Sequence, residues 1–153
     1  MAESYCCPLC RATASLWLVQ HGHPIADCDA CGHRFCPVTS ADSHAIEHYG
    51  DDYFTGGGAG YTDYVAESGL LIDHGRQYGQ ILSRYARTGR VLDVGCAAGF
   101  ILAGMSQSGW SGTGLDPNAS MVAHGRAHLG LDLRQGTLET FQPEDAFDVV
   151  SMI

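Results

Sequence analysis

The second half of the chain alternates short apolar runs with amphipathic segments. Four runs have the length and apolar content of buried strands: residues 90–94, 112–115, 131–134 and 147–153. Residues 100–108 and 118–129 between them fit helices, and Asn118 is a suitable N-cap for the second. Strands that alternate with helices predict a parallel sheet. We therefore expect an α/β, Rossmann-like doubly wound sheet from residue 89 onward.

A further helix is predicted upstream, over residues 64–87. Its apolar residues recur at helical spacing: Val65, Leu70, Leu71, Tyr78, Ile81, Leu82 and Tyr85. Gly69, Gly75 and Gly79 lie within the same segment and lower its helix propensity. We expect either one helix or two helices separated at a glycine.

The glycine-rich run at residues 56–60 predicts a loop. Together with Tyr61 and Tyr64, this loop is either a lid over a ligand or a linker with two packing tyrosines, and the sequence leaves both interpretations open. The pattern divides the chain into three parts: a small module at residues 1–37, a connecting loop and helix at 38–88, and the sheet-forming part at 89–153.

Cysteine is concentrated at the N-terminus, where six of the seven cysteines precede residue 37. The chain begins without a secretion signal, so such clustering favours metal binding over disulfides. Cys7 and Cys10 form one C-x2-C pair, and Cys28 and Cys31 form a second pair, separated from the first by 17 residues. This spacing predicts a four-cysteine zinc site, with no open coordination position and hence a structural role.

The module around these cysteines is predicted to be a zinc ribbon. Residues 15–19 fit a strand between the two pairs, residues 34–35 fit the start of a return strand, and Gly32 supplies a flexible turn. Five other side chains compete as ligands: Cys6, Cys36, His21, His23 and His33. We expect the four-cysteine set to bind the metal.

The charge of the chain limits its partners. The net charge is −9, and all eight basic residues are arginines scattered along the sequence. Without a basic stripe, nucleic acid is not expected as a partner. No apolar run approaches the ~18 residues of a membrane span. We expect a cytoplasmic protein with a small-molecule substrate; the sequence does not indicate its oligomeric state.

The predicted ligand site lies where the first two strands of the sheet end. Gly95, Ala97 and Gly99 follow the first strand and let the backbone approach a ligand closely. Asp116 ends the second strand, 23 residues after Asp93. An acid at that position can accept hydrogen bonds from both ribose hydroxyls of a nucleoside.

Two cofactor classes fit this logic, and the residue types distinguish them. A nicotinamide-binding G-x-G-x-x-G motif would place Phe100 where close helix–strand packing needs a glycine. The alternative, D-x-G-x-x-x-G, is satisfied by Asp93, Gly95 and Gly99. Its acid repels a pyrophosphate but suits an ammonium group, which favours S-adenosylmethionine (SAM) over NAD.

Residues 91–100 closely resemble the first motif of class I SAM-dependent methyltransferases, and residues 114–117 resemble the second. Further stretches extend the resemblance. Residues 136–139 and 147–150 resemble the segment from the adenine pocket to the fourth strand. The cysteine pairs, with residues 52–54 and 61–64, resemble a bacterial subgroup that has an N-terminal zinc ribbon. The resemblance implies a methyltransferase that uses SAM on a small-molecule acceptor.

The resemblance also implies the cofactor-binding residues: Asp93, Gly95, Ala97, Gly99, Asp116, Pro117, Thr137 and Leu138. Ala97 replaces the central glycine of the first motif. Thr137 stands where the family often has an aspartate that binds the adenine amino group, so the adenine is expected to depend more on Pro117, Leu138 and backbone groups.

The family fold has seven strands in the order 3-2-1-4-5-7-6, and only the first four are predicted here. We therefore expect the sequence to be a piece of a longer protein, and we can assign no catalytic residue. The alternative function is a zinc-ribbon binding module beside a non-catalytic nucleotide-binding remnant. A nicotinamide oxidoreductase is the third hypothesis, which Phe100 disfavours.

Overall fold

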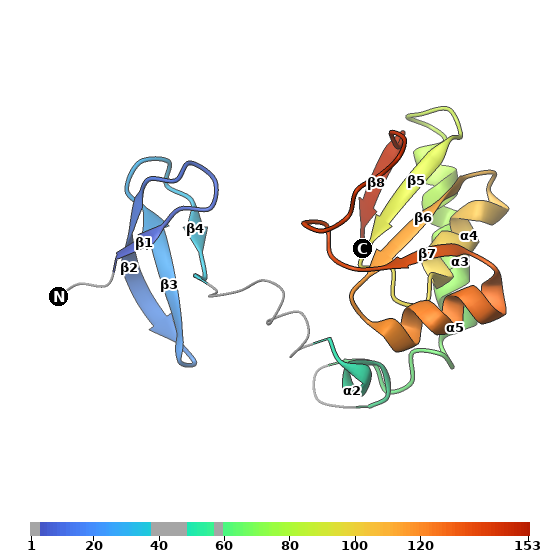
Figure 1. Ribbon diagram of the computed structural model, residues 1–153, viewed down its shortest axis with the longest axis horizontal. Coiled ribbons are helices and arrows are strands. Elements are labelled where there is room, and N and C mark those ends of the chain that lie inside the picture. Colours follow the sequence, from blue (N-terminus) through green and yellow to red (C-terminus); the bar gives the residue numbers. More distant parts are fainter. Residues whose placement is uncertain (1–3, 38–48, 57–59) are drawn as a thin grey trace. The chain divides into compact units, whose positions relative to one another are not determined.

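The computed structural model describes residues 4–37, 49–56 and 60–153. The chain divides into two compact units, Met1–Ala41 and Asp42–Ile153, which Figure 1 shows. Part of the predicted glycine-rich loop, residues 57–59, lies outside the described residues. None of the helices in the described ranges is long and apolar enough to cross a bilayer. The three-part division of the chain stays a prediction.

The first unit is an antiparallel sheet with the strand order β1-β2-β3-β4. Its strands are β1 (Ser4–Cys6), β2 (Thr13–Gln20), β3 (His23–Cys28) and β4 (Arg34–Phe35). The strands predicted at residues 15–19 and 34–35 are confirmed as β2 and β4. Among the described residues of this unit, the buried core consists of Cys7, Ala14, Ala26 and Cys28, with the partly buried Tyr5, Ala12 and Phe35 packed against it. A core of such small side chains cannot stabilise the unit alone, so another source of stability is needed.

The second unit contains the predicted parallel sheet, with the order β7-β6-β5-β8. Its elements are β5 (Arg90–Val94), α4 (Phe100–Gln107), β6 (Ser111–Asp116), α5 (Ala119–Leu129), β7 (Asp132–Gln135) and β8 (Val149–Met152). This confirms the predicted fold class and the spatial order 3-2-1-4 of the four strands. Right-handed connections along one direction of the sheet place α4 and α5 on the same face.

Within the described residues, α2 (Asp51–Phe54) and α3 (Ser68–Leu82) precede the sheet, and α3 is unbroken. It packs along α4 through glycines. A Cβ atom at Gly75 would lie 2.1 Å from the carbonyl oxygen of Ile101, and one at Gly104 would lie 2.0 Å from that of Ile72. The glycines that lower the helix propensity of this segment are therefore what allows the two helix backbones to touch.

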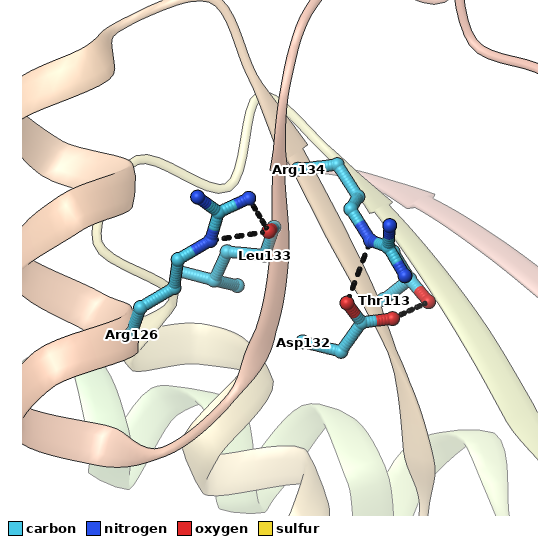
Figure 2. Close-up of polar contacts among 5 residues, drawn as sticks. All are labelled: Thr113, Arg126, Asp132, Leu133 and Arg134. Carbon is cyan, nitrogen blue, oxygen red and sulfur yellow. Dashed lines mark hydrogen bonds and ion pairs between the residues drawn. The ribbon is translucent and has the colours of Figure 1, made fainter.

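The outer strand β7 is held by a polar group that Figure 2 shows in detail. Thr113 on β6 and Arg134 each donate to the Asp132 carboxylate, at 2.9 and 2.7 Å. Burial alone would raise the pKa of Asp132, but these hydrogen bonds outweigh it and lower the pKa. Arg126 on α5 donates twice to the Leu133 carbonyl, at 2.8 and 2.6 Å. This guanidinium occupies a backbone acceptor of the strand and discourages pairing with another chain there.

Candidate functional site

The turn after β5 has the backbone conformation that its small residues predict. Gly95, Ala97 and Gly99 have φ angles of 75°, 49° and 78°, in the left-handed region. The amides of Gly95 and Cys96 donate to the Leu115 carbonyl at 2.8 and 3.1 Å, which ties the turn to the end of β6. Left-handed backbone is costly for a residue with a Cβ, so Ala97 is held there by its surroundings.

The two glycines of this turn have different roles. A Cβ atom added at Gly95 would meet no atom within 4 Å, so the space above this residue is open. A Cβ atom at Gly99 would lie 2.9 Å from Leu131 and 3.1 Å from Leu133. Gly99 is therefore needed for packing and for the start of α4, whereas Gly95 borders room for a ligand.

Asp116 joins the turn to the start of α5. Its Oδ2 accepts from the amide of Ala97 at 2.7 Å, and its Oδ1 accepts from the amide of Asn118 at 2.8 Å. The carboxylate is buried, and burial raises its pKa although both amide bonds act to lower it. Each oxygen keeps a second lone pair for a ligand. Replacing Asp116 would consequently disturb the turn as well as any ribose bound there.

Asp93 is the second buried acid at this edge of the sheet. Its Oδ1 accepts from the hydroxyl of Ser151 at 2.7 Å, and the two residues are paired across β5 and β8. Burial, with a contribution from the negative charge of Asp116, raises the pKa of Asp93 to about 6, against the effect of the Ser151 hydrogen bond. A buried acid that still ionises near neutral pH is a candidate ligand for a cation.

An aromatic group covers the glycine turn. The Tyr64 ring lies 5.2 Å from Phe100 and 5.3 Å from Phe54, centroid to centroid. These rings form one buried cluster with Ala97 and Ala98 of the turn. Tyr64 is therefore a packing residue, in agreement with the linker interpretation, and the segment before α3 forms part of the wall of the site.

Asn118 confirms its predicted role as the N-cap of α5 and has a further one. Its side-chain oxygen accepts from the amide of Met121 at 2.9 Å. Its Nδ2 donates to the Tyr49 carbonyl at 3.2 Å and to Asp51 at 3.1 Å. One amide side chain therefore caps a helix at the site and holds the start of α2 against it.

The remaining predicted residues follow the ends of β6 and β7. Gly136 donates its amide to the Asp116 carbonyl at 3.0 Å, which brings the next residues toward the second strand. Thr137 is half-buried in a turn closed by Thr140. Leu138 is half exposed and leaves an apolar surface there. Pro117 contributes its carbonyl to the side chain of Gln135 at 3.4 Å.

The four predicted metal ligands lie together in the first unit. The Sγ atoms of Cys7, Cys10, Cys28 and Cys31 are all within 4.8 Å of one another. Three of the separations are 3.7 Å for Cys7–Cys31, 3.4 Å for Cys10–Cys28 and 3.5 Å for Cys10–Cys31. Tetrahedral zinc with bonds of about 2.3 Å needs sulfurs about 3.8 Å apart. The cluster therefore fits zinc closely, and among the described residues the competing cysteines and histidines are not part of it.

The two C-x2-C turns have matching backbones. Each first cysteine accepts at its carbonyl an amide four residues later, Arg11 to Cys7 and Gly32 to Cys28, both at 3.0 Å. Arg11 and Gly32 have φ angles of 63° and 71°. Gly32 confirms the turn that its position predicts, and Arg11 adopts the same conformation without being a glycine. Such repeated geometry aims each pair of thiols at a common centre.

Two contributions to the sheet-edge site were not foreseen from the sequence. Ser151 lies within an apolar run and carries no motif, but a hydroxyl in a strand predicted to neighbour the first strand was a usable signal. The link from Asn118 to Asp51 joins segments 67 residues apart, and no pattern along the chain indicates it.

Comparison with known proteins gives the following. Residues 91–153 match the family described as "Methyltransferase domain". The "Ubiquinone biosynthesis O-methyltransferase" of Bradyrhizobium diazoefficiens is 38% identical over 66 residues, which cover 40% of this chain and 26% of that protein. Its counterpart in Bradyrhizobium sp. (strain ORS 278) is 35% identical over the same shares. The chain thus spans about a quarter of the length of these relatives.

Among solved structures, DesVI of Streptomyces venezuelae is similar in fold. It is 24% identical with a TM-score of 0.50, over 59% of this chain and 39% of that chain.

Proposed function

We propose that this chain binds SAM and that the protein transfers its methyl group to a small-molecule acceptor, because residues 91–153 match the family described as "Methyltransferase domain" and their motifs resemble those of class I, SAM-dependent enzymes. The observation that supports this most directly is the open space above Gly95. Gly95 lies between the buried acids Asp93 and Asp116 in the sequence, and all three residues lie at the same edge of the sheet. A nucleoside with a charged amino-acid tail has a partner for each of its parts there.

Each residue of the site has a distinct role in this proposal. Asp93 faces the ammonium group of the methionine part, and the open backbone at Gly95 lets the cofactor lie against the turn. Asp116 accepts from the ribose hydroxyls through its remaining lone pairs. Pro117, Thr137 and Leu138 border the adenine. Ala97 and Gly99 shape the turn without contributing a bulky side chain.

The chemistry follows from position. When bound, SAM supplies an electrophilic methyl group, and catalysis requires that this group be held in line with the acceptor's nucleophile. The residues described here bind and orient the cofactor. We propose also that the site does not bind NAD, because the buried carboxylate of Asp93 would repel the pyrophosphate of that cofactor.

We infer a structural zinc ion at Cys7, Cys10, Cys28 and Cys31. The four thiolates would fill its coordination shell, which leaves no position for a substrate. The residues 1–37 would then form a zinc-ribbon module, followed by the connecting part at 38–88 and the cofactor half at 89–153. Cysteines kept reduced for a metal suit the cytoplasm, where we place the protein.

The acceptor class is supported by the relatives, whose names place them in ubiquinone biosynthesis, the synthesis of a small molecule. The proposal is tested by incubating the protein that contains this sequence with SAM labelled in its methyl group and a metabolite extract. We expect label in compounds that pass an ultrafiltration membrane and none in acid-precipitated protein or nucleic acid. Label confined to the precipitate would refute a small-molecule acceptor. Absence of any transfer, together with intact zinc binding, would favour a zinc-ribbon binding module with a nucleotide-binding remnant.

A further inference from the structure

Asp93 is held from one side only. Its Oδ1 is fixed by the Ser151 hydroxyl at 2.7 Å, and the same hydroxyl lies 3.5 Å from the Leu92 carbonyl. Among the described residues, no donor lies within hydrogen-bond distance of Oδ2. Every fully buried side-chain oxygen of those residues does have a hydrogen-bond partner, so an oxygen without one is not fully buried. Oδ2 is therefore accessible from the space at the carboxyl edge of the sheet.

No cationic side chain among the described residues forms an ion pair with Asp93. The titratable groups that act on it are Asp116, Cys96 and Tyr64, from β6, the glycine turn and the segment before α3. Burial raises the pKa of Cys96 and of Tyr64, so both stay neutral at physiological pH. The ion pairs of the described residues join other groups: Arg34–Asp27, Arg76–Asp73, Arg90–Asp145 and Arg134–Asp132. The ionised form of Asp93 is therefore stabilised by the hydroxyl donor and by any cation that binds beside it.

We propose that Ser151 is a positioning residue for the cofactor: its hydroxyl fixes Oδ1 of Asp93 and thereby presents Oδ2, as part of a carboxylate, to the ammonium group of the methionine moiety. This rests on the proposed SAM binding. Ser151 lies on β8, outside the two motifs at residues 91–100 and 114–117. The ammonium subsite therefore combines residues of β5 and β8.

The physical reason is that a hydrogen bond donated to a carboxylate stabilises its charged form. Without the hydroxyl, burial and the charge of Asp116 act on Asp93 unopposed, and its proton is lost only at higher pH. Ser151→Ala should therefore weaken binding of the ammonium group at about pH 6 and below, where Asp93 of the unmodified protein titrates, and should have little effect well above that pH. Ser151→Thr keeps a hydroxyl and should behave as the unmodified protein does.

The test is calorimetric titration, from about pH 5 to about pH 8, with two ligands. S-adenosylhomocysteine has the ammonium group, and methylthioadenosine has the same adenosine without it. For the unmodified protein, we expect affinity for S-adenosylhomocysteine to fall as the pH drops through about 6. In Ser151→Ala this fall should occur about one pH unit higher, with roughly fivefold weaker binding near pH 6. Affinity for methylthioadenosine should be the same in both proteins.

Ser106→Ala is the matched control, because its hydroxyl donates at 2.9 Å to a helix carbonyl, that of Leu102, and does not contact Asp93. A normal pH profile for S-adenosylhomocysteine in Ser151→Ala would overturn the inference and leave SAM binding intact. Equal weakening of both ligands would also overturn it, since that indicates a general structural role. An unmodified protein that binds neither ligand would overturn the proposed function and this inference together.

Discussion

Replacement of Cys28 with serine is expected to release the metal and unfold the first unit. In the described part of that unit the fully buried side chains are cysteines and alanines, so the unit has little stability apart from the metal. Zinc bound by four thiolates contributes about 10 kcal/mol or more to the folding of small modules. Metal content should fall from about one zinc per chain to almost none, and amide exchange in residues 4–37 should become fast. Exchange in the second unit should change little.

Cys36→Ser is the control for this experiment. Cys36 is an exposed cysteine outside the four-thiol cluster, and its variant should retain the metal and the protected amides. If Cys28→Ser keeps its full zinc content, the ligand assignment is wrong.

Replacement of Asp93 with asparagine is expected to stabilise the second unit while it weakens cofactor binding. Asparagine keeps an oxygen that accepts from Ser151, but it removes a buried charge. The pKa of Asp93 is raised from 3.8 to about 6, and each pKa unit corresponds to about 1.4 kcal/mol. Ionisation of Asp93 thus lowers the free energy of unfolding by roughly 2–3 kcal/mol at neutral pH.

The stabilisation of Asp93→Asn should depend on pH in a definite direction. A carboxyl group whose pKa is higher in the folded chain holds its proton more tightly there, so its penalty is absent below about pH 4, grows between about pH 4 and 6, and is complete above that. The gain in the free energy of unfolding of Asp93→Asn, measured by urea unfolding, should therefore be small at about pH 4 and complete at about pH 7.5. Its affinity for S-adenosylhomocysteine should drop roughly tenfold at the higher pH. A variant that is less stable than the unmodified protein at the higher pH would contradict the account.

Much of the cofactor half could be predicted because local pattern and tertiary structure agree there. The apolar run of β5, the small residues of the turn and the cap at Asn118 each follow from local backbone requirements. The four-cysteine cluster was predictable for the same reason, since a C-x2-C turn is a local structure. Parallel strands joined by helices then fix the strand order through general rules of connection.

The sequence was less informative where packing departs from the usual pattern. Helical spacing suggested Leu70 and Ile81 for the packed face of α3, but they are 55% and 46% exposed. The packed face instead uses Gly75 and Gly79, because the backbone of α4 approaches there. The strand β3 was not predicted, since Pro24 is disfavoured within strands and the short run Ile25–Cys28 lacks a clear strand pattern. Contacts between distant segments, such as Ser151 with Asp93, depend on register, which a pattern along the chain does not specify.

The central claim, that the open turn at Gly95 holds SAM, is tested most directly by titrating the protein with S-adenosylhomocysteine and, separately, with NAD. The comparison includes Gly95→Val and Gly130→Val, because both glycines have positive φ and open space at the Cβ position, with Gly130 at the end of α5. Both variants bear similar backbone strain, but only the first fills the cofactor space. We predict that S-adenosylhomocysteine binds the unmodified protein and Gly130→Val but not Gly95→Val, and that NAD binds none of them. Tight binding of NAD without S-adenosylhomocysteine, or equal affinity for S-adenosylhomocysteine in all three proteins, would contradict the account.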